Sequence, residues 1–384
     1  LKNKNLSMYK ILTLLGTRPE IIKMSELIKL LDKNLNNYLV HTGQNYDYEL
    51  NEIFFKDLGL RKPDHFLNAD TSSAINSISD IIKKTDEVIK KIKPDAFLIY
   101  GDTNSCLAAI SAKKNKIPIF HFEAGNRSFD SLVPEETNRK IVDHISDVNF
   151  VLTEHARRYL IREGINQHLI FKSGSHLPEI LKVHKNKINK SKILINLKLK
   201  KNNYFLFSFH REENVDYNNN LNEILESIEL IYQKFKLPIL ISTHPRTLAR
   251  FQKNKIYEKL KKNKKINFHK PLGFFDYLAL QISSKCVISD SGTITEESSF
   301  LNFPAVTIRK SHERPEGFDS GVLIMTGMNR QAILSAINIT IKNFDKSSNR
   351  QIPDFQQADV SQKIMKIIMS YIPYIKENTW KIKQ

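Results

Sequence analysis

The amino-acid sequence predicts an α/β protein built from two doubly wound, Rossmann-like domains that face a central cleft. Its 384 residues are enough for two or three domains of ordinary size. Short apolar runs alternate with amphipathic stretches through both halves of the chain. Strands that are apolar on both faces and separated by helices are typical of parallel sheets covered by helices on each side.

The expected strands are short apolar runs. In the first half they lie at residues 9–16, 38–43, 96–102, 117–125, 148–153 and 169–175. In the second half they lie at 204–211, 238–246, 266–272, 285–292 and 304–310. Amphipathic helices are expected between the strands, for example over 19–31 and 77–92.

The same rhythm predicts the domain boundaries. We expect one Rossmann-like domain over residues 1–177, a second over 178–360 and a C-terminal amphipathic helix over 361–384. The first boundary is placed at 178 because the stretch 177–204 is polar and rich in lysine, as a linker would be.

Composition narrows the class of protein. The formal net charge is +18, which would suit a nucleic-acid partner. However, the lysines are scattered and often stand beside asparagines, so solvated faces of a lysine- and asparagine-rich protein are the simpler interpretation and no nucleic-acid partner is expected. Cys106 and Cys286 lie in separate halves without metal-binding spacing, which favours a reducing cytoplasm and no metal site.

No apolar run is long enough to cross a membrane, and no membrane association is expected. The basic start of the chain faintly resembles a signal peptide. The apolar run that follows is too short for one, and we interpret it as the first strand.

Polar motifs follow the expected strands, at the end where parallel sheets bind ligands. In "SDSGTITEESS", Ser291, Gly292 and Thr293 would place backbone N–H groups at a helix N-terminus, which suits a phosphate. Glu297, one turn later, could accept hydrogen bonds from a ribose diol. The alternative is ordinary helix capping.

Cations accompany this loop in other motifs. Arg18 and Lys23 stand in "GTRPEIIK", and Arg314 stands in "HERPEG". Several cations and one helix N-terminus suit a diphosphate. A plain helix start with surface cations is the alternative reading of "GTRPEIIK".

Acidic groups and histidines form a second set. Asp102, Glu123 and Glu135 follow first-half strands, and Glu136 is adjacent to the last of them. His210 begins "HREEN", and His244 begins "HPRT". Each alone could be a solvated loop residue or a helix cap, but together they are typical of a general acid–base set. No GxGxxG, Walker loop, HExxH or GxSxG is present, so no cofactor is expected.

Taken in order from about residue 9 to 330, these motifs, together with "HTGQNYDYELNEIFF" and "PEETNRKIVDHISD", closely resemble the non-hydrolysing UDP-N-acetylglucosamine 2-epimerase family. The resemblance implies a glycosyltransferase-B-like fold, a C-terminal domain that binds UDP, and a last helix that packs back on the N-terminal domain. It also implies a UDP-sugar substrate, a homodimer and no cofactor. The variants "AGNRSFDSLVPEE" and "SHERPEGFDSG" are most similar to the UDP-N-acetyl-L-fucosamine synthase branch.

The resemblance implies roles for individual residues. Asp102, Glu123 and Glu135 would be acid–base residues, and His210 would stabilise the leaving UDP. The substrate-binding residues would be Arg18, Lys23, Arg127, His244, Ser291, Gly292, Thr293, Glu297 and Arg314.

Two departures from the family pattern are relevant to the substrate. Val133 replaces a tryptophan before Pro-Glu-Glu, and "SGT" with Thr293 replaces "SGG". Both could reshape the sugar pocket, and Val133 would fit a sugar that lacks the 6-hydroxyl. UDP-N-acetylglucosamine 2-epimerase, a hydrolysing relative and a glycosyltransferase stay open as alternatives.

Overall fold

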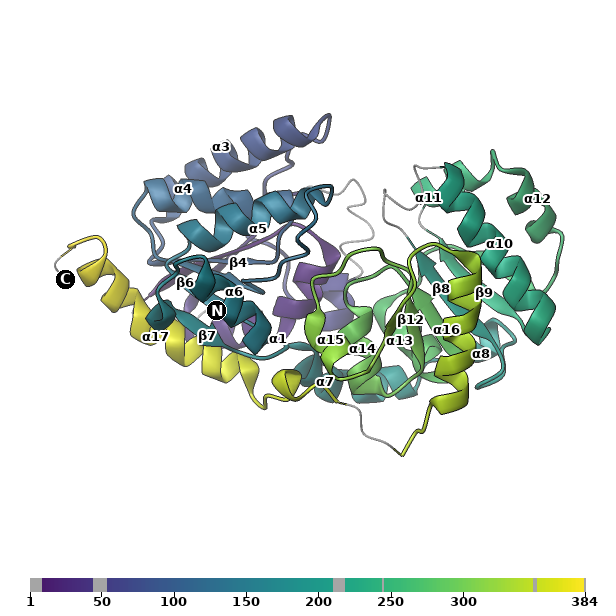
Figure 1. Ribbon diagram of the computed structural model, residues 1–384. Helices are drawn as coiled ribbons and strands as arrows, with labels where there is room; N and C mark the ends of the chain where they lie inside the picture. The colour runs from purple at the N-terminus through teal and green to yellow at the C-terminus, as the bar shows by residue number, and fades with distance from the viewer. Residues whose placement is uncertain (1–8, 44–53, 210–217, 244, 348–350, 383–384) are drawn as a thin grey trace. The chain divides into compact units, whose positions relative to one another are not determined.

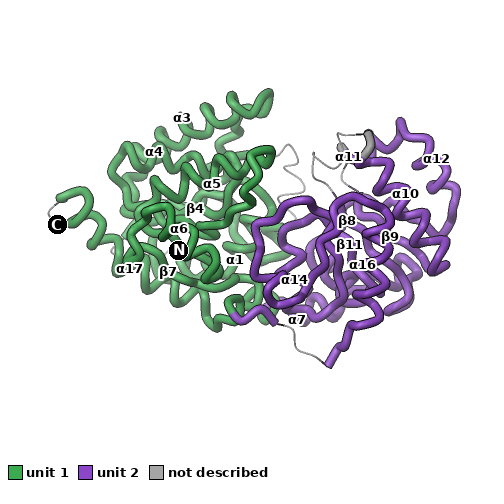
Figure 2. Tube along the Cα trace, viewed as in Figure 1, with its two compact units in different colours: residues 1–182, 354–384 green, residues 183–353 purple. Residues whose placement is uncertain are grey.

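The computed structural model describes residues 9–43, 54–209, 218–243, 245–347 and 351–382. The chain divides into two compact units (Figure 2). Unit 1 comprises residues 1–182 together with 354–384, and unit 2 comprises residues 183–353.

The sheet of unit 1 is parallel, and its seven described strands lie in the order β3-β2-β1-β4-β5-β6-β7. Their bounds are β1 Lys10–Leu15, β2 Asn36–His41, β3 His65–Phe66, β4 Ala96–Tyr100, β5 Ile119–Phe122, β6 Val148–Val151 and β7 Ile170–Lys172. The order reverses between β1 and β4. Their carboxyl ends therefore flank the switch point where such sheets bind ligands.

Helices cover this sheet (Figure 1). They are α1 Arg18–Asn34, α3 Ala74–Ile92, α4 Ala109–Lys114, α5 Pro134–Ile145, α6 Glu154–Arg162 and α17 Val360–Asn378, with short 3₁₀ turns η1 Asn104–Ala108 and η2 Gln167–Leu169. The helix α7 Leu177–Asn189 and the turn η3 Pro353–Phe355 contain the two boundaries between the units. The core between strands and helices is apolar, with Leu12, Phe97 and Ile119 fully buried.

The last helix, α17, belongs to unit 1 and packs against α1. Its Ile364, Ile368 and Ile372 are fully buried, because they recur at four-residue spacing along one face. Lys376 forms an ion pair with Asp95.

The sheet of unit 2 is also parallel, and its six described strands lie in the order β10-β9-β8-β11-β12-β13. Their bounds are β8 Phe205–Phe209, β9 Ile239–Thr243, β10 Ile266–His269, β11 Cys286–Ser289, β12 Ala305–Thr307 and β13 Ile324–Met325. The helices are α8 Ile193–Asn196, α10 Asn218–Phe235, α11 Pro245–Phe251, α12 Lys255–Lys261, α13 Phe274–Ser283, α14 Ile294–Leu301, α15 Pro315–Asp319 and α16 Arg330–Asn343. The prediction of two doubly wound parallel α/β domains is confirmed.

The prediction of a polar linker after residue 177 is wrong. That stretch contains α7 and α8, and Leu177, Ile180 and Ile188 are buried at helical spacing while the lysines between them are exposed. In the sequence, the many lysines obscure the helical spacing of the apolar residues between them.

The unit boundaries differ from the expected 178 and 361. The chain enters unit 2 at residue 183 and returns to unit 1 at 354. The return precedes α17 because Asp354 accepts hydrogen bonds from Lys172 Nζ at 2.9 Å and from the Glu154 N–H at 2.8 Å.

Within the described ranges, no helix combines the length and the apolar character needed to cross a membrane.

Candidate active site

Two of the predicted carboxylates lie at one edge of the unit 1 sheet. Asp102 comes two residues after β4, and Glu123 directly follows β5. These strands are parallel neighbours, with Tyr100 opposite Phe122 in the register. Both carboxylate residues are partly exposed. The carboxyl ends of adjacent strands therefore present two acidic side chains at the same edge.

Helix α5 holds the Asp102 loop and carries the third carboxylate. Arg139 Nε donates to Asp102 Oδ2 at 2.8 Å, and Asn138 Nδ2 donates to the Asp102 carbonyl at 2.9 Å. Glu135 lies in the first turn of the same helix and is partly exposed. Two hydrogen bonds thus hold the Asp102 loop to the helix that also carries Glu135.

The backbone of Glu123 is unusual. Its φ is 66°, in the left-handed region that disfavours residues with a side chain. The side chain accepts a hydrogen bond from Asn126 Nδ2 at 3.2 Å. Such a conformation costs of order 1 kcal/mol or more and is concentrated at functional sites. Ten other described non-glycine residues share this region, among them Lys93 and Asn302 at helix C-caps, so the role expected of Glu123 rests on its place after β5.

Arg127 is part of a buried ionic network rather than a surface that can contact a substrate. Its guanidinium is fully buried and donates to Asp143 at 2.7 Å and to both oxygens of Glu163, at 2.8 and 2.6 Å. Burial opposes ionisation of Asp143, but hydrogen bonds and charge from His121 and Arg127 outweigh it and lower the pKa of Asp143. Because Asp143 and Glu163 engage the guanidinium within unit 1, Arg127 is not among the substrate contacts that we propose.

His121 extends this network to the Asp102 loop. Its Nδ1 lies 2.9 Å from Asp143 Oδ1, and its Nε2 lies 2.8 Å from the Gly101 carbonyl oxygen. A carbonyl oxygen only accepts, so Nε2 carries a hydrogen. The imidazole therefore ties the end of β4 to helix α5.

Glu136, the neighbour of Glu135, holds the preceding loop. Its Oε2 accepts hydrogen bonds from the N–H and the hydroxyl of Ser128, both at 3.0 Å, and from Arg139 at 2.9 Å. Burial raises the pKa of Glu136, but these partners outweigh it and lower the pKa overall. Val133, in the same loop, is only 2% exposed, so the expectation that it lines a sugar pocket is not supported.

The predicted cations of unit 1 lie on α1. Arg18 is its first residue, and its guanidinium carbon lies 5.8 Å from the centre of the Phe54 ring. Lys23 follows on the same helix and is buried. Glu20 lies between them and was not predicted as a site residue. Its spacing from Thr17 matches a capping pair, which was the available signal.

In unit 2, the "SGT" turn joins β11 to α14. Its side chains form a chain of hydrogen bonds: Thr293 Oγ1 lies 2.9 Å from Ser291 Oγ and donates to Glu297 Oε1 at 2.8 Å. Gln281 Nε2 donates to the other oxygen of Glu297 at 2.5 Å. Since Thr293 gives its proton to Glu297, the Ser291 hydroxyl donates to Thr293. Gln281, on α13, has no local sequence signal and was missed.

Buried ion pairs surround the turn. Arg309 contacts both oxygens of Glu313, at 3.0 and 2.7 Å. A Cβ atom at Gly292 would overlap the Glu313 carboxylate, so a side chain at this position would have to displace Glu313 from Arg309. Arg314, predicted to face the substrate, is 3% exposed and lies 3.2 Å from Glu296. His210 and His244 lie outside the described residues.

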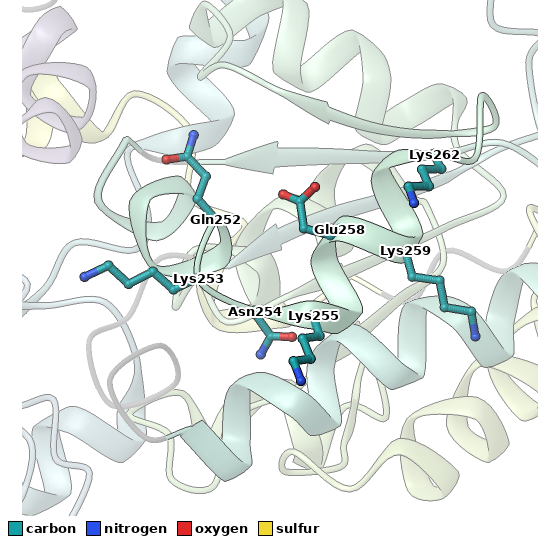
Figure 3. Close-up of a pocket in the computed structure, with 7 residues that line it drawn as sticks. All are labelled: Gln252, Lys253, Asn254, Lys255, Glu258, Lys259 and Lys262. Atoms are coloured by element: carbon teal, nitrogen blue, oxygen red, sulfur yellow. The ribbon is translucent and has the colours of Figure 1, made fainter.

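A separate hollow of about 380 Å³ lies at α12 (Figure 3). Its lining residues are Gln252, Lys253, Asn254, Lys255, Glu258, Lys259 and Lys262. The lysine side chains point in different directions in Figure 3, as on a solvated surface. None of the predicted site residues lines it.

The fold indicates the structural class of the protein. Two parallel α/β units with polar loops at the strand ends are glycosyltransferase-B-like, and the structure superimposes on the glycotransferase of kitacinnamycin with a TM-score of 0.60 at 9% identity, over 95% of this chain and 99% of that one. At that identity the likeness concerns the fold alone.

The chain belongs to the UDP-N-acetylglucosamine 2-epimerase family, because the sequence model of that family matches residues 29–369. The family prediction, and with it the assignment to UDP-sugar 2-epimerases, is confirmed.

Three relatives illustrate the likeness. The UDP-N-acetylglucosamine 2-epimerase structure from Rickettsia bellii has 50% identity and a TM-score of 0.91, covering 97% of this chain and 99% of that one. The Methanocaldococcus jannaschii enzyme, in complex with UDP-GlcNAc and UDP, has 35% identity and a TM-score of 0.87, covering 94% and 99%. The Pseudomonas aeruginosa UDP-2,3-diacetamido-2,3-dideoxy-D-glucuronate 2-epimerase is 32% identical, covering 86% of this chain and 92% of the relative.

Proposed function

We propose that the protein epimerises a UDP-2-acetamido sugar at C2 by elimination and re-addition of UDP. The observation that carries the proposal is the acidic edge of unit 1, where Asp102 and Glu123 follow adjacent strands and the helix that is hydrogen-bonded to the Asp102 loop carries Glu135 in its first turn.

The chemistry explains why several carboxylates are needed. The C2–H bond of the sugar is not acidic, because no carbonyl group is adjacent to it. A base removes the C2 proton while the C1–O bond to UDP breaks, which leaves a 2-acetamidoglycal and UDP. UDP then adds back to C1 as a proton is delivered to the opposite face of C2. Inversion thus requires proton transfer on both faces, for which Asp102, Glu123 and Glu135 are the candidates.

The nucleotide would bind at the "SGT" turn of unit 2. Ser291, Gly292 and Thr293 supply N–H groups and hydroxyls near the start of α14, and Glu297 presents a carboxylate. We propose further contacts from Arg18, Lys23, His244 and Arg314, and leaving-group stabilisation by His210.

For the sugar we propose UDP-2-acetamido-2,6-dideoxy-L-talose, converted to UDP-N-acetyl-L-fucosamine for a capsule or O-antigen. The support is the variant motif over 124–136. Its loop exposes two apolar side chains, Phe129 at 72% and Leu132 at 88%, which suit a 6-methyl group better than a 6-hydroxyl. UDP-N-acetylglucosamine is the second candidate, supported by the relatives from Rickettsia bellii and Methanocaldococcus jannaschii, which are UDP-N-acetylglucosamine 2-epimerases.

A substrate comparison in heavy water tests both. Each UDP-sugar is incubated separately with the protein and followed by NMR. We expect deuterium at C2 and recovery of the UDP-sugar, faster with the 6-deoxy-L-talo compound. Release of free sugar with UDP would indicate a hydrolysing enzyme, and faster turnover of UDP-N-acetylglucosamine would favour the second candidate. A cytoplasmic homodimer stays a prediction, to be checked by light scattering and cell fractionation.

The hydrogen-bond chain at Thr293 gives a further testable prediction. Thr293→Val keeps the shape but removes the hydroxyl that joins Ser291 to Glu297. We expect UDP to bind about three- to tenfold more weakly, the effect of one or two lost hydrogen bonds. Thr293→Ser is the matched control and should bind like the wild type, measured by calorimetry. Equal affinity of both variants for UDP would contradict the role of the hydroxyl.

A further inference from the structure

Glu20 is a buried carboxylate that joins two loops of unit 1. It lies in the first turn of α1 and is 3% exposed. Its Oε2 accepts the Gly16 N–H at 2.5 Å. Its Oε1 accepts the hydroxyls of Thr17 at 2.9 Å and Thr103 at 2.8 Å. Gly16 and Thr17 belong to the loop after β1, whereas Thr103 belongs to the loop after β4.

The two loops are in close contact at this point. A Cβ atom at Gly16 would overlap the side chain of Ser105, which itself is hydrogen-bonded to Thr42 at 2.8 Å. The loop after β1 leads into Arg18, and the loop after β4 contains Asp102. A shift of one loop would therefore move a proposed phosphate-binding cation relative to a proposed acid–base carboxylate.

The carboxylate of Glu20 has donors around it but no neutralising cation among the described residues. Burial raises its pKa to about 7, although the hydrogen bonds from Gly16, Thr103 and Thr17 act in the opposite direction. The titratable groups on the surrounding elements are Arg18 and Lys23 on α1, Asp102 after β4, and the buried thiol of Cys106, whose pKa is raised by burial and by Asp102 and Glu20.

We propose that ionised Glu20 is a positioning residue that fixes the Asp102 loop against the start of α1 for the epimerisation reaction. This rests on the proposed function. The ionised form accepts all three donors without a competing proton, whereas the protonated form places its own hydrogen against one of them.

The pH dependences of stability and activity then oppose each other. Because the pKa is raised on folding, the folded chain binds this proton more tightly than the unfolded chain does. The stabilisation is complete below pH 4.5 and is lost as the pH rises through about 7. Activity, in contrast, should rise over the same interval. A group that lowers stability at neutral pH is expected where function requires it.

Two threonine variants distinguish the hydrogen bond between the two loops from the hydrogen bond within the first loop. Thr103→Val removes the hydrogen bond that crosses from the β4 loop, and Thr17→Val removes only the bond within the loop after β1. We expect Thr103→Val to lower kcat about tenfold with unchanged UDP affinity, and Thr17→Val to stay within about twofold of the wild type. Equal kcat values for the two variants would overturn the proposal.

Glu20→Gln tests the charge. Its amide keeps the shape and can place its oxygen on the Gly16 N–H, but its Nε2 donates where Oε1 accepted the hydroxyls of Thr17 and Thr103, and it cannot ionise. We expect the acid limb of the kcat profile near pH 7 to disappear, with kcat fixed at the low level of the wild type in acid. An acid limb that persists in Glu20→Gln would overturn the proposal. A wild type that turns over no UDP-sugar would instead refute the proposed function.

Discussion

Replacing Glu123 by Gln is expected to lower turnover by about two to four orders of magnitude, while UDP still binds. The change removes a proton-transfer group from the acidic edge, and such groups typically contribute about 10²- to 10⁴-fold in rate. Gln has nearly the same size and can accept the Asn126 hydrogen bond, so the loop should keep its conformation. Turnover is measured by NMR and UDP affinity by calorimetry.

Glu229→Gln provides the matched control for Glu123→Gln. Glu229 forms an ion pair with Lys259, a mostly exposed side chain, on the surface of unit 2, and such pairs contribute little. We expect its turnover to equal that of the wild type. If Glu123→Gln also loses UDP binding, the role of Glu123 is structural, and if it retains normal turnover, Glu123 is not an acid–base residue.

The second large effect concerns stability. Arg127→Met is expected to destabilise unit 1 by about 3–5 kcal/mol, because Asp143 and Glu163 lose their shared cation and Asp143 stays fully buried. Trp380, the single tryptophan, lies in unit 1 and stacks with Lys113 at 5.1 Å from the ring centre to Nζ. Its fluorescence during urea unfolding therefore reports on this unit.

Lys90→Met is the comparison for that measurement, because Lys90 lies in the same unit as the tryptophan. Its side chain is 68% exposed and pairs with Asp86 on the surface of α3, so its loss should leave the stability of unit 1 nearly unchanged. A shift of the unfolding midpoint by Arg127→Met that is no larger than the shift by Lys90→Met would show that the buried network adds little.

The strands that were predicted and those that were missed differ in a physical way. Runs such as 96–102 and 148–153 contain buried strands because both faces are covered by helices, and that leaves an apolar signature in the sequence. The two-residue strand β3 has no such run, and its pairing with β2 defines it. The strand β13 lies in the short apolar run 322–325, which was not assigned to a strand because only two of its residues pair with β12.

The sequence was enough to place the site residues at strand ends, but it did not show which of them contact a substrate and which support the structure. Arg127 and Glu123 stand in the same motif. Only the fold brings Glu163, which is 36 residues further along the chain, against Arg127 and encloses it. Glu20 looks like a helix cap in the sequence, and its link to Thr103 spans 83 residues. Contacts of this range leave no local pattern.

The return of the chain to unit 1 has a consequence for synthesis on the ribosome. Unit 2 is one continuous segment, 183–353, and can fold as soon as it emerges. Unit 1 needs α17, whose buried isoleucines are translated only after the whole of unit 2. The apolar surface of α1 therefore stays uncovered while unit 2 is being made, and the nascent N-terminal segment is the part that would most need a chaperone.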